Sequence, residues 1–398
     1  VLFLLGLVPG LPHVAFLTLS AVTAGAAYVI SSRKKASAAR DIESEAEAAA
    51  PEAEELSEIT PLDPLSMEVG YRLIPMVDTS SGGELLDRIK AMRKQSANES
   101  GFLVPPIHIK DNLQLKPEEY IFLLKGSEIG RGEVMINHSL AIDPGNAQEG
   151  LEGIPTKEPA FGLPAFWVDD NLKDKAKMMG YTVVNPSIVM VTHLTELIRA
   201  NSNEILSRQD VQLMLDSLAK SHPKVVEELV PTLLSVGAVQ KVLKNLLKER
   251  VSIRDILTIV ETLADYGPII KDPDMLTGFV RQALARTITK QYVDATGTVT
   301  CLMLDPQLEE TINQAVSQSQ KGGVLALDPQ VTQSLLTAVS VGMQEMVTQG
   351  HQPLLMTSPE IRLFVKGLAE RVLPSLVVLS SNEISGDVKI KNYKMVRL

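Results

Sequence analysis

Three glycines close together could form part of a phosphate-binding loop. Gly126, Gly130 and Gly132 lie in the segment KGSEIGRGE. A phosphate loop needs Gly-Lys-Ser/Thr where a strand leads into a helix, so that backbone N–H groups and the lysine reach the anion. Neither that sequence nor that context is present here. The segment instead predicts a β-hairpin with glycine in its turn.

Histidine, cysteine and paired carboxylates could act in catalysis or bind a metal ion. Cys301 lies in an apolar strand pattern, where a thiol behaves as a small hydrophobic side chain, and no GxSxG sequence is present. The carboxylate pairs at 169–170 and 309–310 lie where helices should begin, and there they interact favourably with the helix dipole. The scattered histidines, without HExxH spacing, are His108, His138, His193, His222 and His351. These residues indicate no enzyme, no metal ion and no cofactor.

The single tryptophan is the strongest remaining candidate for a contact with a partner. Trp167 lies near Phe161, Pro164 and Phe166. Such a group of aromatic residues predicts a buried cluster, and a groove for a partner protein is the alternative.

The pattern of the elements changes along the chain. Strand-like alternation with intervening helices extends from residue 65 to about 200, and helical periodicity dominates the next ninety or so residues. Ser252 and Asp255 predict a capping box there, and Asp272 should cap a helix that has Pro273 at its first position. From 294 onward, strand, capped helix and strand predict a βαβ unit with a small parallel sheet.

A membrane-tethered α/β enzyme is one functional alternative, because α/β sheets hold active sites at the carboxyl ends of their strands. Asp305, Ser358 and Ser381 lie at these predicted ends. Helix caps and turns explain them better than catalysis does.

The N-terminal residues have the composition of a membrane segment. Residues 1–32 contain no Asp, Glu, Lys or Arg, and about 12–31 predicts a transmembrane helix. Basic residues at 33–35 and at Arg40 follow, which indicates that the rest of the chain is cytoplasmic. A signal peptide would have its basic residues before the apolar run. The chain begins with Val1, which suggests further residues upstream.

The charge of the chain and of one segment indicates which classes of partner the protein can bind. The segment 41–58 has eight acidic residues and no basic ones, and is typical of a flexible tether. The net charge of −10 argues against binding to nucleic acid. One cysteine excludes an internal disulfide, as is common in a reducing compartment.

Three long segments carry a resemblance to a known family. They are LVPPIHIKDNLQLKPEEYIFLLKGSEIGRGEV at 103–134, EPAFGLPAFWVD at 158–169, and the stretch from VEELVPTLLSVGAVQKVLKNLL to GFVRQALART at 226–287. They closely resemble the FlhA/LcrD/InvA family, the export-gate proteins of bacterial type III secretion. Two segments, SRQDVQLMLDSLAK at 207–220 and SIRDILTIVETLADYG at 252–267, are similar to its flagellar branch. A virulence secretion system is the alternative.

The resemblance implies an α+β multidomain protein of the bacterial inner membrane, multi-pass, with a large cytoplasmic domain. It places the end of the membrane region at 1–32 and an acidic linker at 33–64. Four subdomains are implied: α+β at 65–181 and 231–250, helical at 182–230, helical at 251–293, and α/β at 294–398.

The resemblance also implies partners. The cytoplasmic domain would form a nine-membered ring with its own copies and bind flagellar export chaperones that carry filament-type cargo. It would also bind the export ATPase complex and other export-gate membrane proteins. Export in the family draws on the proton motive force.

The family's chaperone-docking site corresponds here to Asn203, Leu206 and Gly237. The enterobacterial members have Asp, Phe and Thr at these positions, so this chain lacks a charge and a hydroxyl and keeps an apolar side chain. We expect Leu206 to anchor a partner segment and Asn203 to orient it.

Overall fold

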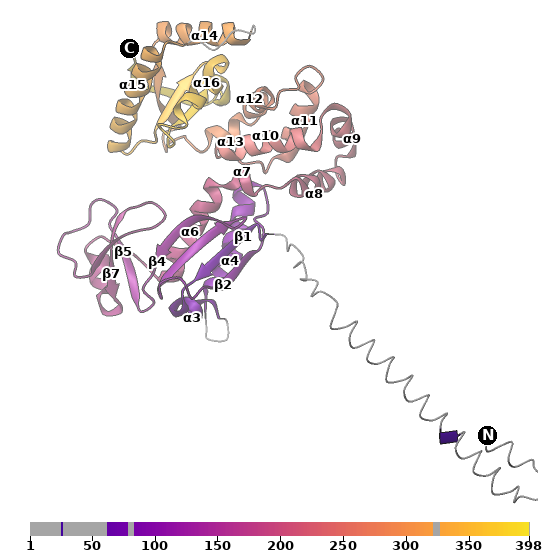
Figure 1. The fold of residues 1–398 in the computed structure, drawn as a ribbon. Helices are drawn as coiled ribbons and strands as arrows, with labels where there is room; N and C mark the ends of the chain where they lie inside the picture. The colour runs from indigo at the N-terminus through magenta and orange to yellow at the C-terminus, as the bar shows by residue number, and fades with distance from the viewer. Residues whose placement is uncertain (1–24, 27–61, 79–82, 321–326, 398) are drawn as a thin grey trace, which may run out of the picture. The chain divides into compact units, whose positions relative to one another are not determined.

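The computed structural model describes residues 25–26, 62–78, 83–320 and 327–397 of the chain (Figure 1). The chain divides into two compact units, Val1–Leu62 and Asp63–Leu398. The predicted transmembrane helix at about 12–31 and the acidic linker at 33–64 lie almost wholly outside the described residues. Among the helices described, none combines the length and the apolar composition that crossing a membrane requires.

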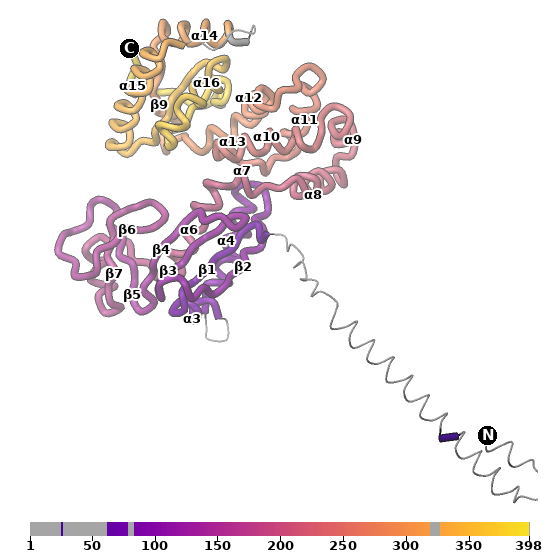
Figure 2. The backbone as a smooth tube through the Cα atoms, in the orientation of Figure 1, coloured from indigo at the N-terminus to yellow at the C-terminus, as the bar shows by residue number. Residues whose placement is uncertain are grey.

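The first sheet has the strand order β2-β1-β3-β4 (Figure 2). Its strands are β1 (Leu65–Val69), β2 (Ile107–Asp111), β3 (Glu119–Leu124) and β4 (Ser127–Glu133). Strand β1 is parallel to β2 and antiparallel to β3. The strand-like alternation predicted from residue 65 onward is therefore confirmed in this sheet, in which β1 lies between β2 and β3.

The predicted glycine hairpin is confirmed, and its glycines have two different roles. Strands β3 and β4 pair as a hairpin whose turn has positive φ at Lys125 (50°) and Gly126 (80°). A Cβ at Gly130 would lie 2.4 Å from Leu197 Cδ1, and one at Gly132 would lie 2.4 Å from the Tyr120 hydroxyl oxygen. These two glycines therefore allow close packing against β4.

Two long helices share a hydrophobic core with this sheet. They are α4 (Leu85–Ser100) and α6 (Pro186–Ala200), which contact each other. The short elements η1 (Tyr71–Leu73) and α3 (Ile74–Val77) precede them. The buried His193 of α6 lies with its Nδ1 3.0 Å from the Tyr120 hydroxyl, and burial lowers the pKa of its imidazole.

The second sheet is antiparallel, with the order β6-β7-β5-β8. Its elements are β5 (His138–Ile142), β6 (Ile154–Lys157), β7 (Pro164–Asp169), η3 (Asp170–Leu172), α5 (Lys173–Met178) and β8 (Thr182–Val184). Trp167 is 5% exposed and belongs to the main core, so the prediction that it is buried is confirmed. Phe161 is 60% exposed and lies outside that core.

A helical region follows the second sheet. Its elements are α7 (Ser202–Ile205), α8 (Arg208–Ala219), α9 (Pro223–Glu227), η4 (Glu228–Leu233), α10 (Val236–Lys248), α11 (Ile256–Tyr266), α12 (Pro273–Ala283) and α13 (Ala285–Thr289). Asp272 caps α12 as predicted, by accepting from the N–H groups of Asp274 and Met275.

The predicted capping box of Ser252 and Asp255 is wrong. Asp255 alone is the N-cap of α11 and accepts a hydrogen bond from the N–H of Thr258. The Ser252 hydroxyl instead donates to the carbonyl oxygen of Glu99 at 2.6 Å, and so links the start of the next segment to α4. A long-range contact thus took the place of a local one.

The third sheet is parallel throughout, in the order β11-β10-β9-β12, which confirms the predicted parallel sheet. Its elements are β9 (Thr298–Leu304), α14 (Pro306–Gln320), α15 (Pro329–Thr348), β10 (Leu354–Thr357), α16 (Pro359–Ala369), β11 (Val377–Ser380), η5 (Ser381–Glu383) and β12 (Lys389–Val396). Strand β12 was not predicted from the sequence, because this edge strand is largely exposed and rich in lysine.

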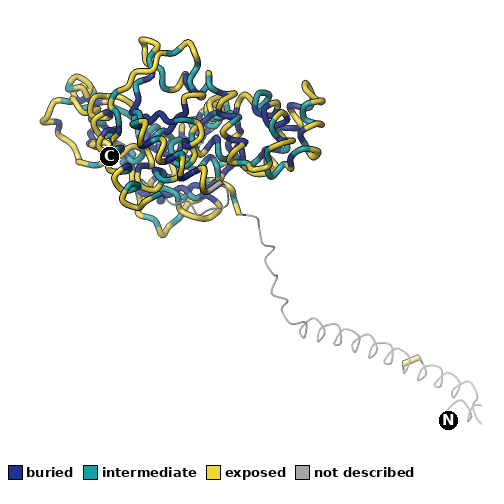
Figure 3. The backbone as a smooth tube through the Cα atoms, turned by 90° about the horizontal axis from the view of Figure 1, so that it is seen from above, coloured by how far each residue is buried: buried dark blue, intermediate teal, exposed yellow. Residues whose placement is uncertain are grey.

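Four charged side chains are enclosed between the helical region and the third sheet. Arg281 of α12 lies 2.5 Å from Glu383 of η5 and 3.2 Å from Glu249, which follows α10. Arg362 of α16 lies 2.6 Å from Glu249 and 3.3 Å from Glu383. Each arginine therefore pairs with both carboxylates. Figure 3 shows buried, intermediate and exposed residues along the backbone of the described chain.

These ion pairs make stability depend on pH. Burial raises the pKa of Glu249, but the charges of Arg281 and Arg362 lower it more, so it lies below its ordinary value. A carboxyl group of this kind stabilises the fold above the pKa it has in the unfolded chain, and that stabilisation is lost as the pH falls through the folded-state pKa.

We expect Glu249→Gln to lower the free energy of unfolding by about 3 kcal/mol at pH 7, because it leaves two buried guanidinium groups without enough negative charge. The difference from the wild type should begin to shrink as the pH falls below the ordinary glutamate pKa of about 4.3, because the unfolded wild type then takes up a proton, and should vanish only below the lowered folded-state pKa. Urea unfolding at several pH values measures both.

The matched control is Glu345→Gln, which breaks the exposed pair with Lys394. It should change stability by less than about 1 kcal/mol. If both variants lost the same free energy of unfolding, enclosure of the ion pairs would contribute nothing to stability.

Candidate docking site

The three residues expected to bind a chaperone lie where α7, α8 and α10 meet. Asn203 is in α7, Leu206 ends that helix, and Gly237 is in the first turn of α10. The Nε2 of Gln240 in α10 donates to the carbonyl oxygen of Leu206 at 3.0 Å. A Cβ at Gly237 would lie 2.9 Å from Nη2 of Arg208. We call residues 203–208 and 235–240 the docking junction.

Local sequence fixes the two longer helices at this junction. Ser207 and Asp210 form a capping box at the start of α8, with each side chain accepting from the other residue's N–H. Ser235 caps α10 by accepting from the N–H of Ala238. Because both helices begin here, their partly positive N-termini both lie at the junction.

The exposure of the three residues differs. Leu206 is 0% exposed and packs in the main core. Asn203 and Gly237 are each half-buried. In this structure Leu206 therefore supports the junction from within, and direct contact with a partner would require neighbouring residues to move.

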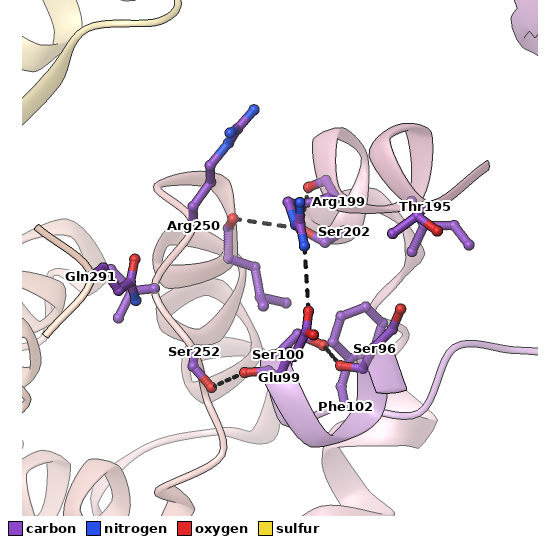
Figure 4. A pocket seen from close by; sticks show the side chains of 13 residues that line it. Ser96, Glu99, Ser100, Phe102, Thr195, Arg199, Ser202, Arg250, Ser252 and Gln291 are labelled. Carbon is purple, nitrogen blue, oxygen red and sulfur yellow. Dashed lines mark hydrogen bonds and ion pairs between the residues drawn. The ribbon is translucent and has the colours of Figure 1, made fainter. Parts of the chain in front are cut away.

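A pocket of about 330 Å³ lies close to Ser202, next to the junction in sequence (Figure 4). It is lined by α4, α6, the start of α7 and the end of α10, together with Gln291. Arg199 forms an ion pair across it with Glu99 at 3.3 Å. The Ser252 hydroxyl reaches the Glu99 carbonyl oxygen from the opposite side.

The hydroxyl groups of this pocket already have acceptors. Ser100, Thr195 and Ser202 each donate to a main-chain carbonyl oxygen, at 2.5, 2.7 and 3.0 Å. A hydroxyl oriented toward a carbonyl needs a base to act as a nucleophile, and no carboxylate or imidazole accepts from these groups. The arrangement joins three elements of the chain and favours a structural role.

The other candidate groups for chemistry are also held by structural contacts. Burial raises the pKa of the Cys301 thiol to about 11, so it stays protonated at neutral pH. Asp305 accepts from the N–H of Gln307 at the start of α14, and Ser358 precedes α16 as its N-cap residue. Ser381 begins η5. Within the described part of the chain, no group of three or more His, Cys, Asp or Glu side chains could hold a metal ion.

Comparison with solved structures defines the class of protein. The Chlamydia pneumoniae CdsV protein matches with a TM-score of 0.76 and 27% identity, over 86% of this chain and 100% of that chain. The nonameric EPEC SctV-C matches with a TM-score of 0.69 and 22% identity, over 85% and 99%. The fold of this chain is that of these two proteins and of the C-terminal domain of InvA, which also matches.

The chain belongs to the FHIPEP family, whose model matches residues 1–389. It is 42% identical to the flagellar biosynthesis protein FlhA of Bacillus subtilis over 343 residues, which are 86% of this chain and 51% of that protein. It is 43% identical to FlhA of Escherichia coli over 392 residues, which are 98% of this chain and 56% of that protein. The chain thus spans a little over half the length of these relatives.

We expect Leu206→Asp to lower the free energy of unfolding by about 3 kcal/mol or more, because it buries a carboxylate without a partner. Urea unfolding measures the loss. Leu213→Asp, at a position 56% exposed on the adjacent helix α8, should change stability by less than about 0.5 kcal/mol. Equal stability of the two variants would contradict the buried position of Leu206.

Proposed function

We propose that the chain is the C-terminal part of a membrane component of the flagellar protein export apparatus. It docks export chaperones with their cargo, together with the export ATPase complex, at a gate in the bacterial inner membrane through which the proton motive force drives secretion. The observation that carries this proposal is the 42% identity to FlhA of Bacillus subtilis over 86% of the chain. In this role the chain binds and positions its partners and catalyses no reaction.

The virulence type III secretion gate is the second candidate, because the matching structures include CdsV of Chlamydia pneumoniae. The identity to that chain is 27%, whereas the flagellar relatives reach 42–43%. The flagellar function is therefore favoured.

We also propose that the domain assembles with its own copies into a ring of nine. The matching SctV-C structure is described as nonameric, and this chain shares its fold. A further matching structure is that of a complex between CdsV and CdsO, which supports binding to a second protein through this fold.

Deletion of the gene in its own organism tests the function. We expect cells without filaments that retain filament protein inside, and recovery when the gene is returned. Normal flagella together with loss of another secreted set of proteins would instead support the virulence gate.

The proposed docking site is the docking junction, with Leu206 supporting it and Asn203 contacting the partner. The amide of Asn203 makes no side-chain hydrogen bond among the described residues and lies half-buried. It is thus available to orient a bound segment. A Cβ at Gly237 would lie 2.9 Å from Nη2 of Arg208, so the glycine lets the Arg208 side chain lie close to the start of α10.

We expect Asn203→Ala to weaken binding of a chaperone–cargo complex by roughly threefold to tenfold, the loss of about one hydrogen bond. Calorimetry on the detergent-solubilised chain measures this, and thermal unfolding confirms that the variant is folded. The matched control is Asn146→Ala at an exposed position of the second-sheet region, which should bind as the wild type does. Unchanged affinity for Asn203→Ala would remove this residue from the site.

A further inference from the structure

Four basic side chains gather beside the docking junction. Lys125 is in the β3–β4 turn, and Arg208 is the first residue of α8. Lys241 and Lys244 lie on the same side of α10, because residues three apart in a helix are neighbours. The Nζ of Lys125 donates to the main-chain oxygen of Glu204 in α7 at 3.0 Å, so the hairpin turn reaches the junction. We call these four residues the cation cluster.

The members of the cation cluster are close enough to act on one another. Burial lowers the pKa of Lys244, and the charges of Lys125, Lys241 and Arg208 lower it further. The charge of the nearby Glu204 acts in the opposite direction and raises that pKa. Charges brought together in this way repel each other, which costs stability unless a ligand offsets the repulsion.

In the part of the chain that the structure describes, the four cations of the cluster lie together without a carboxylate partner, whereas the unpaired lysines Lys157, Lys175 and Lys224 lie outside the cluster. Other basic side chains of the first sheet and its helices, such as Arg131 and Arg88, form ion pairs with neighbouring carboxylates. In the described residues no member of the cation cluster lies within ion-pair distance of a carboxylate. The whole chain has a net charge of −10, so this positive surface is local and not a consequence of composition.

The cation cluster also has an accessible position. Lys125, Arg208 and Lys241 are exposed, and Lys244 is half-buried. They come from a hairpin turn and from two helices, so an extended ligand can contact all of them. The N-termini of α8 and α10 add positive potential at the same place.

We propose that the cation cluster binds an acidic segment of the protein that docks at the junction, with successive carboxylates of that segment facing these four side chains. The inference rests on the proposed docking function and names the chemistry of the partner. Opposite charges across such a surface speed up association and exclude basic partners, and the interaction weakens as salt is added. The acidic segment would supply negative charge next to the docking junction, where Asn203 is uncharged.

The experiment titrates the detergent-solubilised 398-residue chain with an oligo-glutamate peptide at low and at high salt. The test variant carries Lys125→Gln, Lys241→Gln and Lys244→Gln. The matched control carries Lys157→Gln, Lys175→Gln and Lys224→Gln, three exposed lysines that lie outside the cluster and form no ion pair in the described structure. Both variants lose the same charge.

We expect the wild type and the control to bind the peptide equally, with affinity falling as salt rises, and the test variant to bind about tenfold more weakly. Equal weakening of both variants would overturn the proposal, because only net charge would matter. So would binding of glycerol phosphate, a lipid headgroup, in preference to the peptide.

A second titration separates this proposal from the docking function. A chaperone–cargo complex that binds the wild type and the test variant equally would overturn the role of the cation cluster and leave the docking function intact. Loss of chaperone–cargo binding with the test variant alone would support both. Absence of that binding for every form of the chain, with peptide binding unchanged, would count against docking only.

Discussion

The enclosed ion pairs of Arg281 and Arg362 with Glu249 and Glu383 hold the helical region against the third sheet. Each arginine contacts both carboxylates, so the four charges form a closed set that is neutral in sum. Charges in a region of low dielectric constant need such partners, because removal of one leaves another without compensation. Helices α12 and α16 each supply one of these arginines, so their relative position must let both arginines reach both carboxylates. Hydrophobic contacts alone would allow small shifts in this packing.

Helix α10 connects this interface to the other functional features. Its apolar face, with Val239, Val242, Leu243, Leu246 and Leu247, is buried in the main core. Its first turn forms the docking junction, its last turn borders the polar pocket, and Glu249 follows immediately after it. A rigid helix of 13 residues thus joins the proposed docking site to the ion pairs at its other end. The position of the junction depends on the packing of this one helix.

Charge has opposite roles at two places along α10. At its C-terminal end the charges are enclosed and fully paired, which favours one arrangement of the surrounding elements. Along its middle, Lys241 and Lys244 join other cations that lack carboxylate partners. A charge with no internal partner contributes little to folding and remains available to a ligand. Electrostatic interaction thus stabilises one packing arrangement at the enclosed ion pairs, and at the cation cluster it allows a ligand to bind.

The sequence by itself determined the features that depend on neighbouring residues. The helix start at Asp272, the glycine turn of the β3–β4 hairpin and the strands β9, β10 and β11 of the third sheet follow from local chemistry and periodicity. Long matching segments also determined the family. Tertiary structure alone decided which distant side chains meet. In the folded chain Arg281 pairs with Glu383, 102 positions away. The Ser252 hydroxyl contacts α4 and does not cap a helix, and Leu206 is buried in the core. These outcomes depend on how whole helices and strands pack. The residues next to a side chain in the sequence do not show which distant residue will contact it after packing.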